Sequence, residues 1–214
     1  MNEGSLTAQK AARRTTGGAN AEQKERIRLA AVQLFTRQGF AATSMKQLAQ
    51  ALDTVAANLY NYFPNKEAIL LDVLEHQLVA MLERDRAILD RAQSPADTLR
   101  SLVRDLVAND LSDPLAAFVG IQGVRGLTEE NLEYVTGLMA QIRTSWTEVI
   151  VAGSEQGDFD VQDPKLVALS ILTLCSSVST WYRPGGEYTA EYVAESVADL
   201  ALRMAGTHGG LNIA

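Results

Sequence analysis

The sequence predicts an all-α protein with a small N-terminal helical domain and a larger C-terminal helical domain. Three observations support this prediction. Apolar residues recur three and four positions apart along most of the chain. Helix-start signals are frequent, whereas the alternating apolar and polar pattern of strands is almost absent. The composition, with 47% hydrophobic and 21% charged residues over 214 positions, is typical of a soluble globular protein with ample core.

The N-terminal part predicts a flexible arm followed by three short helices. Residues 1–20 are rich in Thr, Ala and Gly without an apolar period, so we expect a flexible basic arm there. Asn20 with Gln23, and Ser44 with Gln47, have the spacing of a capping box and predict two helix starts. A third helix, about 55–62, follows a three-residue turn. Residues 21–66 therefore predict a helix-turn-helix domain.

The C-terminal part, residues 67–214, predicts a larger helical domain. A long helix starts near Lys66. Three pairs, Ser94-Pro95, Asp113-Pro114 and Asp163-Pro164, each place a capping side chain before a proline at the first helical position. Further helices are expected at about 95–111, 114–124, 129–156, 164–182 and 190–205. The whole chain then has about nine helices.

The charge distribution indicates a polyanionic partner for the N-terminal domain. The net charge of the chain is −7. Residues 1–66 carry nine Lys or Arg and four Asp or Glu, whereas residues 67–214 carry ten and twenty-two. Without the basic arm the excess of positive charge becomes smaller but persists. A basic head on an acidic body favours nucleic acid binding by the head alone.

The third predicted helix has the residue types of a DNA-reading helix. Only Leu59 and Phe63 are clear core residues, and the remaining positions offer small side chains, asparagines and tyrosines. Small side chains allow close approach to a major groove, Asn amides can read base edges, and Tyr hydroxyls can bond phosphates. Lys66 follows at a helix N-terminus, which also favours a phosphate.

The run LAQALDTVAANLYNYFPNKEAIL resembles the signature of the TetR family of transcriptional regulators, with Leu59-Tyr60, Phe63 and Lys66-Glu67 at the expected spacing. Asp53 replaces the usual turn glycine and can adopt a left-handed conformation. Val55 replaces the usual capping serine, so either Thr54 caps the helix or its start is loose. The alternative role for Tyr60 and Tyr62 is packing against the first helix. The resemblance implies DNA contacts by Ser44, Lys46, Ala56, Ala57, Asn58, Tyr60, Asn61, Tyr62 and Lys66.

The helix that starts at Lys165 is apolar almost all round, which predicts burial on two sides. One side can face its own domain, and the other is expected to face a second copy together with the last helix. The alternative is a central helix in a monomeric bundle. The TetR resemblance also implies a homodimer. The predicted dimer contacts are Leu166, Leu169, Leu174, Val178, Val193, Val197, Leu200 and Met204.

The middle helices are expected to enclose a pocket for a small hydrophobic effector. Arg143 either meets an anionic group of that effector or pairs with a carboxylate such as Glu148. The tail around Trp181-Tyr182-Arg183-Pro184 resembles the TetR subgroup that controls fatty-acid and sterol breakdown, which implies an acyl-CoA thioester; a hydrophobic drug is the alternative. The predicted ligand contacts are Phe118, Gln122, Arg125, Tyr134, Met139, Arg143, Trp146, Trp181 and Arg183.

Catalysis, metal binding and membrane insertion are not expected. The two histidines, His76 and His208, stand far apart and have no cluster at metal-ligand spacing, so no metal or cofactor is predicted. Cys175 is a lone cysteine in an apolar helix, consistent with a reducing cytoplasm. No stretch reaches the ~20 apolar residues of a membrane span.

The sequence therefore predicts a cytoplasmic, homodimeric repressor that binds a double-stranded palindromic operator and is released by its effector. The alternative is a helical small-molecule binding or scaffold protein without specific DNA binding.

Overall fold

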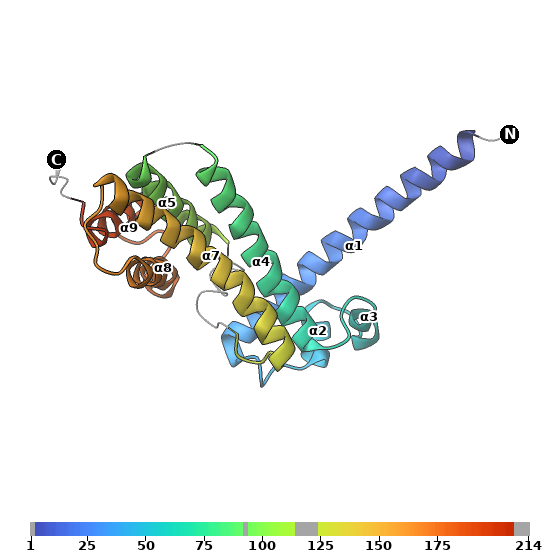
Figure 1. Ribbon diagram of the computed structural model, residues 1–214. Helices are drawn as coiled ribbons and strands as arrows, with labels where there is room; N and C mark the ends of the chain where they lie inside the picture. Colours follow the sequence, from blue (N-terminus) through green and yellow to red (C-terminus); the bar gives the residue numbers. More distant parts are fainter. Residues whose placement is uncertain (1–2, 92–93, 114–123, 208–214) are drawn as a thin grey trace. The chain divides into compact units, whose positions relative to one another are not determined.

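The computed structural model describes residues 3–91, 94–113 and 124–207, with side chains from Asn20 onward. Within these residues the chain is helical and contains eight helices, which confirms the predicted all-α class (Figure 1). The helix expected at 114–124 lies almost wholly outside the described residues. None of the described helices is both long and apolar enough to cross a membrane.

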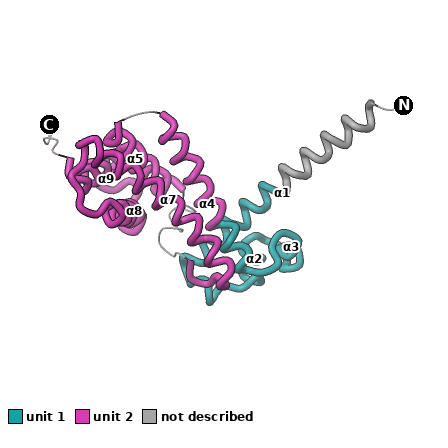
Figure 2. The backbone as a smooth tube through the Cα atoms, in the orientation of Figure 1, with its two compact units in different colours: residues 1–73 teal, residues 74–214 magenta. Residues whose placement is uncertain are grey.

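The chain divides into two compact units, residues 1–73 and 74–214 (Figure 2). The boundary lies seven residues beyond the predicted end of the head domain, within the helix that starts at Lys66. This helix, α4 (Lys66–Leu89), therefore contributes its first two turns to unit 1 and the remainder to unit 2.

Unit 1 is a small helical domain around a compact apolar core. It contains α1 (Glu3–Gln38), α2 (Met45–Ala51), α3 (Ala56–Tyr60) and the start of α4. α2 contacts both α1 and α3. Its large core side chains come from all four helices and from the segment between α3 and α4. Those that are at most 3% exposed include Ile27, Phe35, Leu48, Leu59, Phe63 and Ile69.

The start of α1 differs from the sequence prediction. The structure gives the backbone of α1 as helix from Glu3, whereas the Asn20–Gln23 capping pair predicts a start at Asn20 after a flexible arm. Residues 8–14, Ala-Gln-Lys-Ala-Ala-Arg-Arg, are all strong helix formers. A capping pair inside such a segment does not by itself end the preceding helix, because its side chains can also sit on a helix surface.

Ion pairs join α1 to the first turns of α4 within unit 1. Arg28 donates from Nε to Asp72 Oδ2 at 2.5 Å and from a terminal nitrogen to Glu25 Oε2 at 2.6 Å. Lys24 Nζ lies 3.7 Å from Asp72 Oδ1. The Arg28 side chain is only 13% exposed, so its pairs are better shielded from solvent than ordinary surface pairs. This cluster fixes the entry of α4 into unit 1.

Unit 2 is built around α5 (Pro95–Ser112), which contacts α7 (Glu129–Gln156), α8 (Pro164–Trp181) and α9 (Ala190–Met204). α5 lies at the centre of unit 2 because it carries apolar residues on several of its sides. Its buried residues include Leu99, Leu102, Val103 and Leu106. Arg100 adds a polar connection to α9 by pairing with Glu195 and Asp199.

The helix starts of unit 2 carry the predicted caps. Ser94 accepts from the backbone N–H of Asp97 ahead of α5, and Asp163 accepts from that of Leu166 ahead of α8. Thr189 accepts from the backbone N–H of Tyr192 ahead of α9. Each bond satisfies an amide that the helix itself leaves without an acceptor. The caps that the sequence analysis predicts at Ser94 and Asp163 are confirmed.

The end of α7 is fixed by two glycines and one phenylalanine. Gly157 adopts a left-handed conformation (φ 82°) and ends the helix. The chain then turns back, and the backbone N–H groups of Asp158 and Phe159 donate to the carbonyl of Gly153 at 2.8 and 3.1 Å. The Phe159 ring, 5% exposed, rests on Gly153 so closely that a Cβ there would lie 2.2 Å from a ring carbon.

Gly153→Ala is therefore expected to destabilise the protein by about 2 kcal/mol, because the added methyl overlaps the Phe159 ring. Gly137 lies in the same helix with open space around its Cα, so Gly137→Ala is expected to stabilise by about 0.5–1 kcal/mol through helix propensity. Urea unfolding of both variants measures the difference. Equal effects of the two substitutions would contradict the contact between Gly153 and Phe159.

Candidate DNA-binding surface and ligand cavity

The turn between α2 and α3 has the predicted geometry. Ser44 and Gln47 form the full capping box at the start of α2, with the Ser44 N–H donating to Gln47 Oε1 at 2.8 Å. Asp53 adopts the left-handed conformation (φ 51°) that a glycine would adopt more readily, as predicted. Val55 occupies the cap position of α3 without a side-chain bond, so α3 starts without the usual serine cap.

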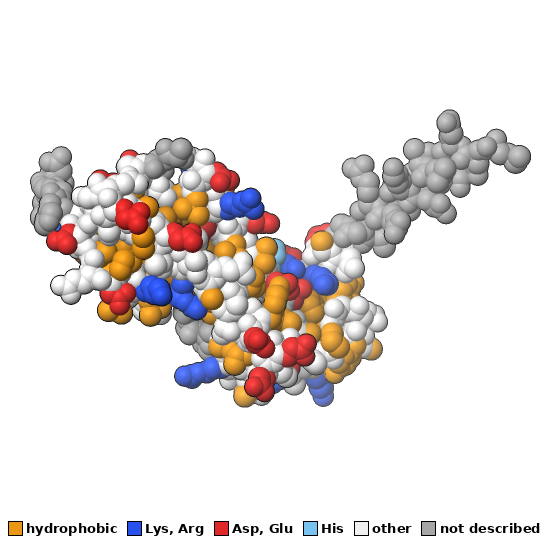
Figure 3. Space-filling model, in the orientation of Figure 1, with side chains coloured by type: hydrophobic (Ala, Val, Ile, Leu, Met, Phe, Trp, Pro, Cys, Tyr) orange, Lys and Arg blue, Asp and Glu red, His pale blue; other side chains and the backbone are white. Residues whose placement is uncertain are grey.

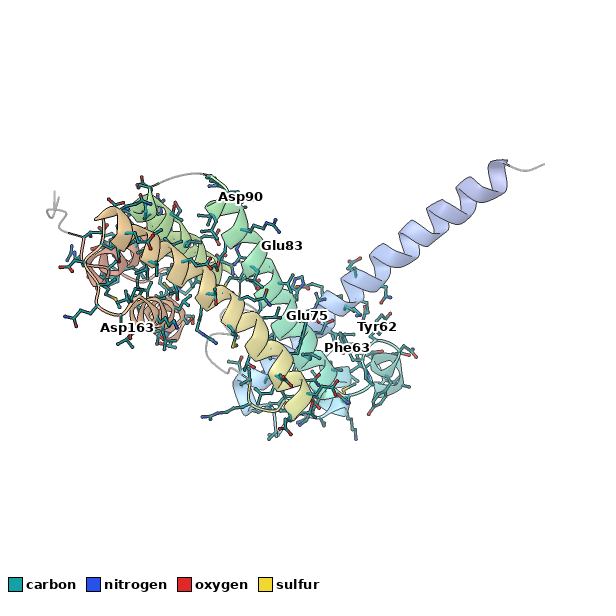
Figure 4. All side chains as sticks on the ribbon, in the orientation of Figure 1. Tyr62, Phe63, Glu75, Glu83, Asp90 and Asp163 are labelled. Atoms are coloured by element: carbon teal, nitrogen blue, oxygen red, sulfur yellow. The ribbon has the colours of Figure 1, made fainter. Side chains whose placement is uncertain are left out.

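The outer face of α3 is exposed and carries polar side chains. Leu59 and Phe63 are buried, while Asn58, Tyr60 and Asn61 face solvent. Tyr60 is 53% exposed, which excludes the alternative that it packs against α1 within unit 1. Tyr62, which lies two residues beyond the end of α3 (Figure 4), is half-buried. The Asn58 amide donates to Thr54 Oγ1 at 2.8 Å, so its carbonyl oxygen remains available as an acceptor.

Six of the nine predicted DNA-contact residues are exposed, namely Ser44, Lys46, Ala57, Asn58, Tyr60 and Asn61. Ala56 and Tyr62 are half-buried. They lie on α2, on α3 or beside these helices, so unit 1 brings these eight residues to one helix-turn-helix. Their contact with DNA remains a prediction.

Lys66 has a different role from the predicted phosphate contact. Its ammonium donates to three backbone carbonyls in the turn after α1, those of Phe40, Ala41 and Thr43, at 2.8, 3.1 and 2.9 Å. It also lies 4.5 Å from the centre of the Phe40 ring. An ammonium has three donors, and all three are used. Lys66 therefore ties the start of α4 to the α1–α2 turn and has no free donor for a phosphate.

Arg26 is a candidate that sequence reasoning missed. It is exposed on α1 and donates to Gln23 Oε1 at 3.2 Å. Both side chains line a polar hollow that also reaches the α2–α3 turn and the end of α3. Nothing in the local sequence distinguishes Arg26 from other surface arginines. Only the fold places its charge beside α3, where it can meet a phosphate. The hollow is lined by Gln23, Arg26, Leu52, Asp53, Thr54, Asn58, Asn61 and Tyr62.

Unit 2 contains a cavity of about 500 Å³ between α4, α5, α7 and α8. Such a volume suits a small ligand or one end of a longer one. Much of its wall is apolar: Leu78 and Met81 from α4, Leu106 from α5, and Met139 and Ile142 from α7, with Leu169 and Leu172 from α8.

The remaining wall of the cavity is polar. Asp110 is 7% exposed and Gln77 is 8% exposed, and both line the cavity together with Asn109 and Arg84. Removal from water raises the pKa of Asp110 to about 7, although Arg84 and a hydrogen bond with Asn109 act in the opposite direction. α8 adds the hydroxyl groups of Thr173, Ser176, Ser177 and Thr180.

Trp146 lies away from the cavity wall, so its prediction as a ligand contact is wrong. Its ring is fully buried, and Nε1 donates to Asp85 Oδ2 at 2.8 Å. Asp85 is itself 2% exposed, and burial raises its pKa to about 6. The indole N–H needs a partner in the core, and a carboxylate on α4 supplies it. Helical periodicity predicts that Trp146 points inward but does not distinguish a core contact from a cavity wall.

The other predicted ligand residues are distributed differently. Met139 and Arg143 line the cavity as predicted. Tyr134 instead donates to Glu75 Oε1 at 2.6 Å on the surface of unit 2, one of the acidic residues along α4 (Figure 4). Arg125, Trp181 and Arg183 are exposed and do not line the cavity, since they lie in or beside turns at helix ends. Phe118 and Gln122 lie outside the described residues.

α8 and α9 leave an apolar face in solvent. Leu166, Leu169, Leu200 and Met204 are 38–58% exposed, and Leu174 is half-buried. Apolar side chains reach the visible surface between acidic ones (Figure 3). An exposed apolar face excludes the alternative in which α8 is the centre of a monomeric bundle.

Three predicted dimer contacts are corrected by the structure. Val178, Val193 and Val197 are 0–5% exposed and belong to the core of unit 2. Val178 lies on α8, and Val193 and Val197 lie on α9. The helical spacing of apolar residues predicts burial, but it does not distinguish the core of the same chain from contact with a second copy.

Two family models match the chain. Residues 27–73 match the model described as bacterial regulatory proteins of the tetR family, and residues 92–205 match the tetracyclin repressor-like C-terminal domain. The second match alone covers more than half of the chain. The chain belongs to the TetR family. It is thus a helix-turn-helix transcriptional regulator rather than an enzyme, and its resemblance to this family is confirmed.

Individual TetR-family proteins are similar to this chain over most of its length. It is 28% identical over 189 residues to the transcriptional repressor KstR2 of Rhodococcus jostii, covering 87% of this chain and 92% of the relative. The TetR-family regulator PfmR of Thermus thermophilus is 31% identical, with a TM-score of 0.74 over 83% of this chain and 97% of PfmR. AibR, solved with isovaleryl coenzyme A and operator DNA, shares the fold at 22% identity and a TM-score of 0.75, over 83% of this chain and 96% of AibR.

Lys66→Met is expected to destabilise unit 1 by on the order of 2 kcal/mol, because three carbonyls lose a charged donor. Lys46→Met removes a lysine charge from the exposed surface of the same unit and is expected to leave stability unchanged within about 0.5 kcal/mol. Thermal unfolding followed by circular dichroism measures both. Equal stability of the two variants would show that Lys66 has no structural role.

Asp110→Asn is expected to become progressively more stable than the wild type as pH rises from 4 to 8. An unfolded Asp loses its proton near pH 4, whereas the folded pKa is about 7, so the wild type loses stability over this interval. The amide has no proton to lose. The difference in unfolding free energy should change by on the order of 3 kcal/mol. Urea titrations at pH 4, 6 and 8 measure it, and a constant difference would contradict the raised pKa.

Proposed function

We propose that the protein is a cytoplasmic, homodimeric TetR-family repressor whose operator affinity is lowered by a small hydrophobic effector of the acyl-CoA class. The observation that carries this proposal is the exposed polar face of α3 on an intact helix-turn-helix. Asn58, Tyr60 and Asn61 offer acceptors and hydroxyl groups to base edges and phosphates, while Leu59 and Phe63 hold the helix in place. A scaffold protein without DNA binding gives no reason for this polar face.

A homodimer supplies the second recognition helix that a palindromic site requires. The exposed apolar residues of α8 and α9 support this arrangement, because Leu166, Leu200 and Met204 gain most by burial against a second copy. The corrected residues Val178, Val193 and Val197 stabilise each protomer instead.

The cavity of unit 2 supports an effector with an apolar part and an anionic part. Met81, Leu106 and Ile142 offer an apolar wall. Arg143 lines the same cavity, is exposed, and forms no ion pair within the described part of the chain. A guanidinium in this position suits a phosphate, and a CoA thioester combines phosphates with an apolar acyl chain. AibR, which was solved with a CoA thioester and operator DNA, has a similar fold.

α4 connects the two activities, because one continuous helix carries Lys66 in unit 1 and the cavity residues Leu78, Met81 and Arg84 in unit 2. A ligand that displaces α4 changes the position of the α1–α2 turn that Lys66 holds. Two recognition helices in a dimer must lie ~34–36 Å apart, so a small displacement weakens the fit to DNA. By linkage, DNA and effector weaken each other's binding by the same factor.

The test uses a duplex selected from a random pool by the full-length protein. Fluorescence anisotropy should give two chains per duplex, with affinity that falls steeply with salt because phosphate contacts release counterions. Tyr60→Phe should weaken binding severalfold on all sequences, whereas Asn58→Ala should change the preferred sequence.

Arg104 on α5 provides the matched control, because it is an exposed cation that belongs to unit 2. Arg104→Gln removes one positive charge and should leave DNA affinity unchanged. Dodecanoyl-CoA should lower the operator affinity of the wild type. Failure to select any duplex would overturn the proposed repressor, and unchanged affinity with CoA thioesters would overturn the proposed effector class.

A further inference from the structure

Three of the four hydroxyl groups on the α8 wall of the cavity act as hydrogen-bond acceptors toward a ligand. Thr173, Ser177 and Thr180 each donate their hydroxyl proton to a backbone carbonyl of α8, at 2.8, 2.7 and 2.6 Å. Their oxygen atoms therefore present only lone pairs to a ligand. The α8 side of the cavity thus accepts hydrogen bonds although it is lined by residues that usually donate as well.

The opposite wall offers both donors and acceptors. Gln77 donates from Nε2 to Asp113 Oδ2 at 3.0 Å, so its carbonyl oxygen and its second amide proton can both meet a ligand. Arg84 donates from Nε to Asp105 Oδ2 at 2.7 Å and has further N–H groups at the cavity wall. Asp110 is more than nine-tenths buried at the cavity wall, and a carboxylate has room for several donors beyond its hydrogen bond with Asn109.

The charges around the cavity disfavour ionic groups at this wall. A ligand carboxylate would lie beside Asp110, which is itself 7% exposed, and like charges repel more strongly where water is scarce. A ligand cation would enter a cavity that also contains the guanidinium groups of Arg84 and Arg143. Burial raises the pKa of Asp110 to about 7, so near neutral pH both protonation states are present. The carboxylate accepts hydrogen bonds, and the protonated carboxyl group can also donate one. A hydroxyl group, which is uncharged and can donate or accept, matches both protonation states.

We propose that Asp110, Gln77 and the α8 hydroxyl groups form a subsite for a hydroxyl group on the apolar part of the effector. This inference rests on the proposed function, and it narrows the effector from an apolar acyl group to a hydroxylated one. Asp110 selects for the hydroxyl and against a free carboxylate, so a free fatty acid is a poor ligand.

The experiment measures affinities by isothermal titration calorimetry at pH 7.5 with two ligand pairs. The first pair is 12-hydroxydodecanoyl-CoA and dodecanoyl-CoA, and the second is decan-1-ol and decanoate. The hydroxylated member of each pair should bind the wild type about tenfold tighter, because one buried hydrogen bond to a carboxyl group increases affinity by about this factor. Equal affinities within both pairs would overturn the subsite.

Three variants separate the role of Asp110 from a general effect on folding. Asp110→Leu should abolish the preference in both pairs. Asp110→Asn keeps an acceptor but has no charge, so it should retain the preference in the CoA pair and lose it between decanol and decanoate. Asp90→Asn removes an exposed charge at the end of α4 and should change neither ratio. Circular dichroism checks that each variant is folded, and unchanged ratios in folded Asp110→Asn would contradict the role of this carboxyl.

The two pairs also distinguish this inference from the proposed function. If neither CoA thioester binds but decanol binds in preference to decanoate, the acyl-CoA class fails and the hydroxyl subsite stands. If both thioesters bind equally and decanol shows no advantage, the effector class stands and the subsite fails. Absence of binding by all four ligands overturns the subsite.

Discussion

The structure depends on the requirement that every buried polar group has a partner. Among the described residues, no buried side-chain nitrogen or oxygen lacks one. In unit 1, Lys66 donates to three backbone carbonyls in the turn after α1. In unit 2, Trp146 and Asp85 satisfy each other inside the helical core. Such bonds add little net stability, but their loss is costly, so they fix which helix faces meet. The orientation of α3 and the shape of the cavity follow from these pairings.

At the cavity wall, the carboxyl group of Asp110 meets this requirement only in part. The hydrogen bond between Asp110 and Asn109 leaves most of the capacity of a buried carboxyl group unused. Burial of Asp110 lowers the stability of the ligand-free protein. A ligand that supplies a hydrogen-bond donor to this carboxyl group would offset that cost and would therefore bind more tightly. Binding sites are commonly positions where the local rules of folding are not fully satisfied. Asp110 lines the cavity, where a ligand can reach it, whereas Asp85 meets Trp146 and does not line the cavity.

Local sequence signals predicted local structure well in this chain. The caps at Ser44, Ser94 and Asp163 and the left-handed Asp53 all follow from short-range chemistry, and each is present. Signals that depend on distant partners were less informative. The acceptors of Lys66 lie 23 to 26 residues before it, and no local pattern identifies them. The apolar residues of α8 likewise did not reveal that Val178 is buried while Leu166 is exposed, because apolar residues occur on every side of this helix, beside its serines and threonines.

Cys175, on the inner side of α8, is the only cysteine of the chain and is fully buried. Burial raises the pKa of its thiol well above the ordinary value, and the nearby Asp110 carboxylate acts in the same direction. A thiol reacts with peroxide or electrophiles through its thiolate, which is very scarce here and is covered by neighbouring helices. The Cys175 thiol is therefore expected to be unreactive in the folded protein and to be modified only when α8 separates from the rest of unit 2.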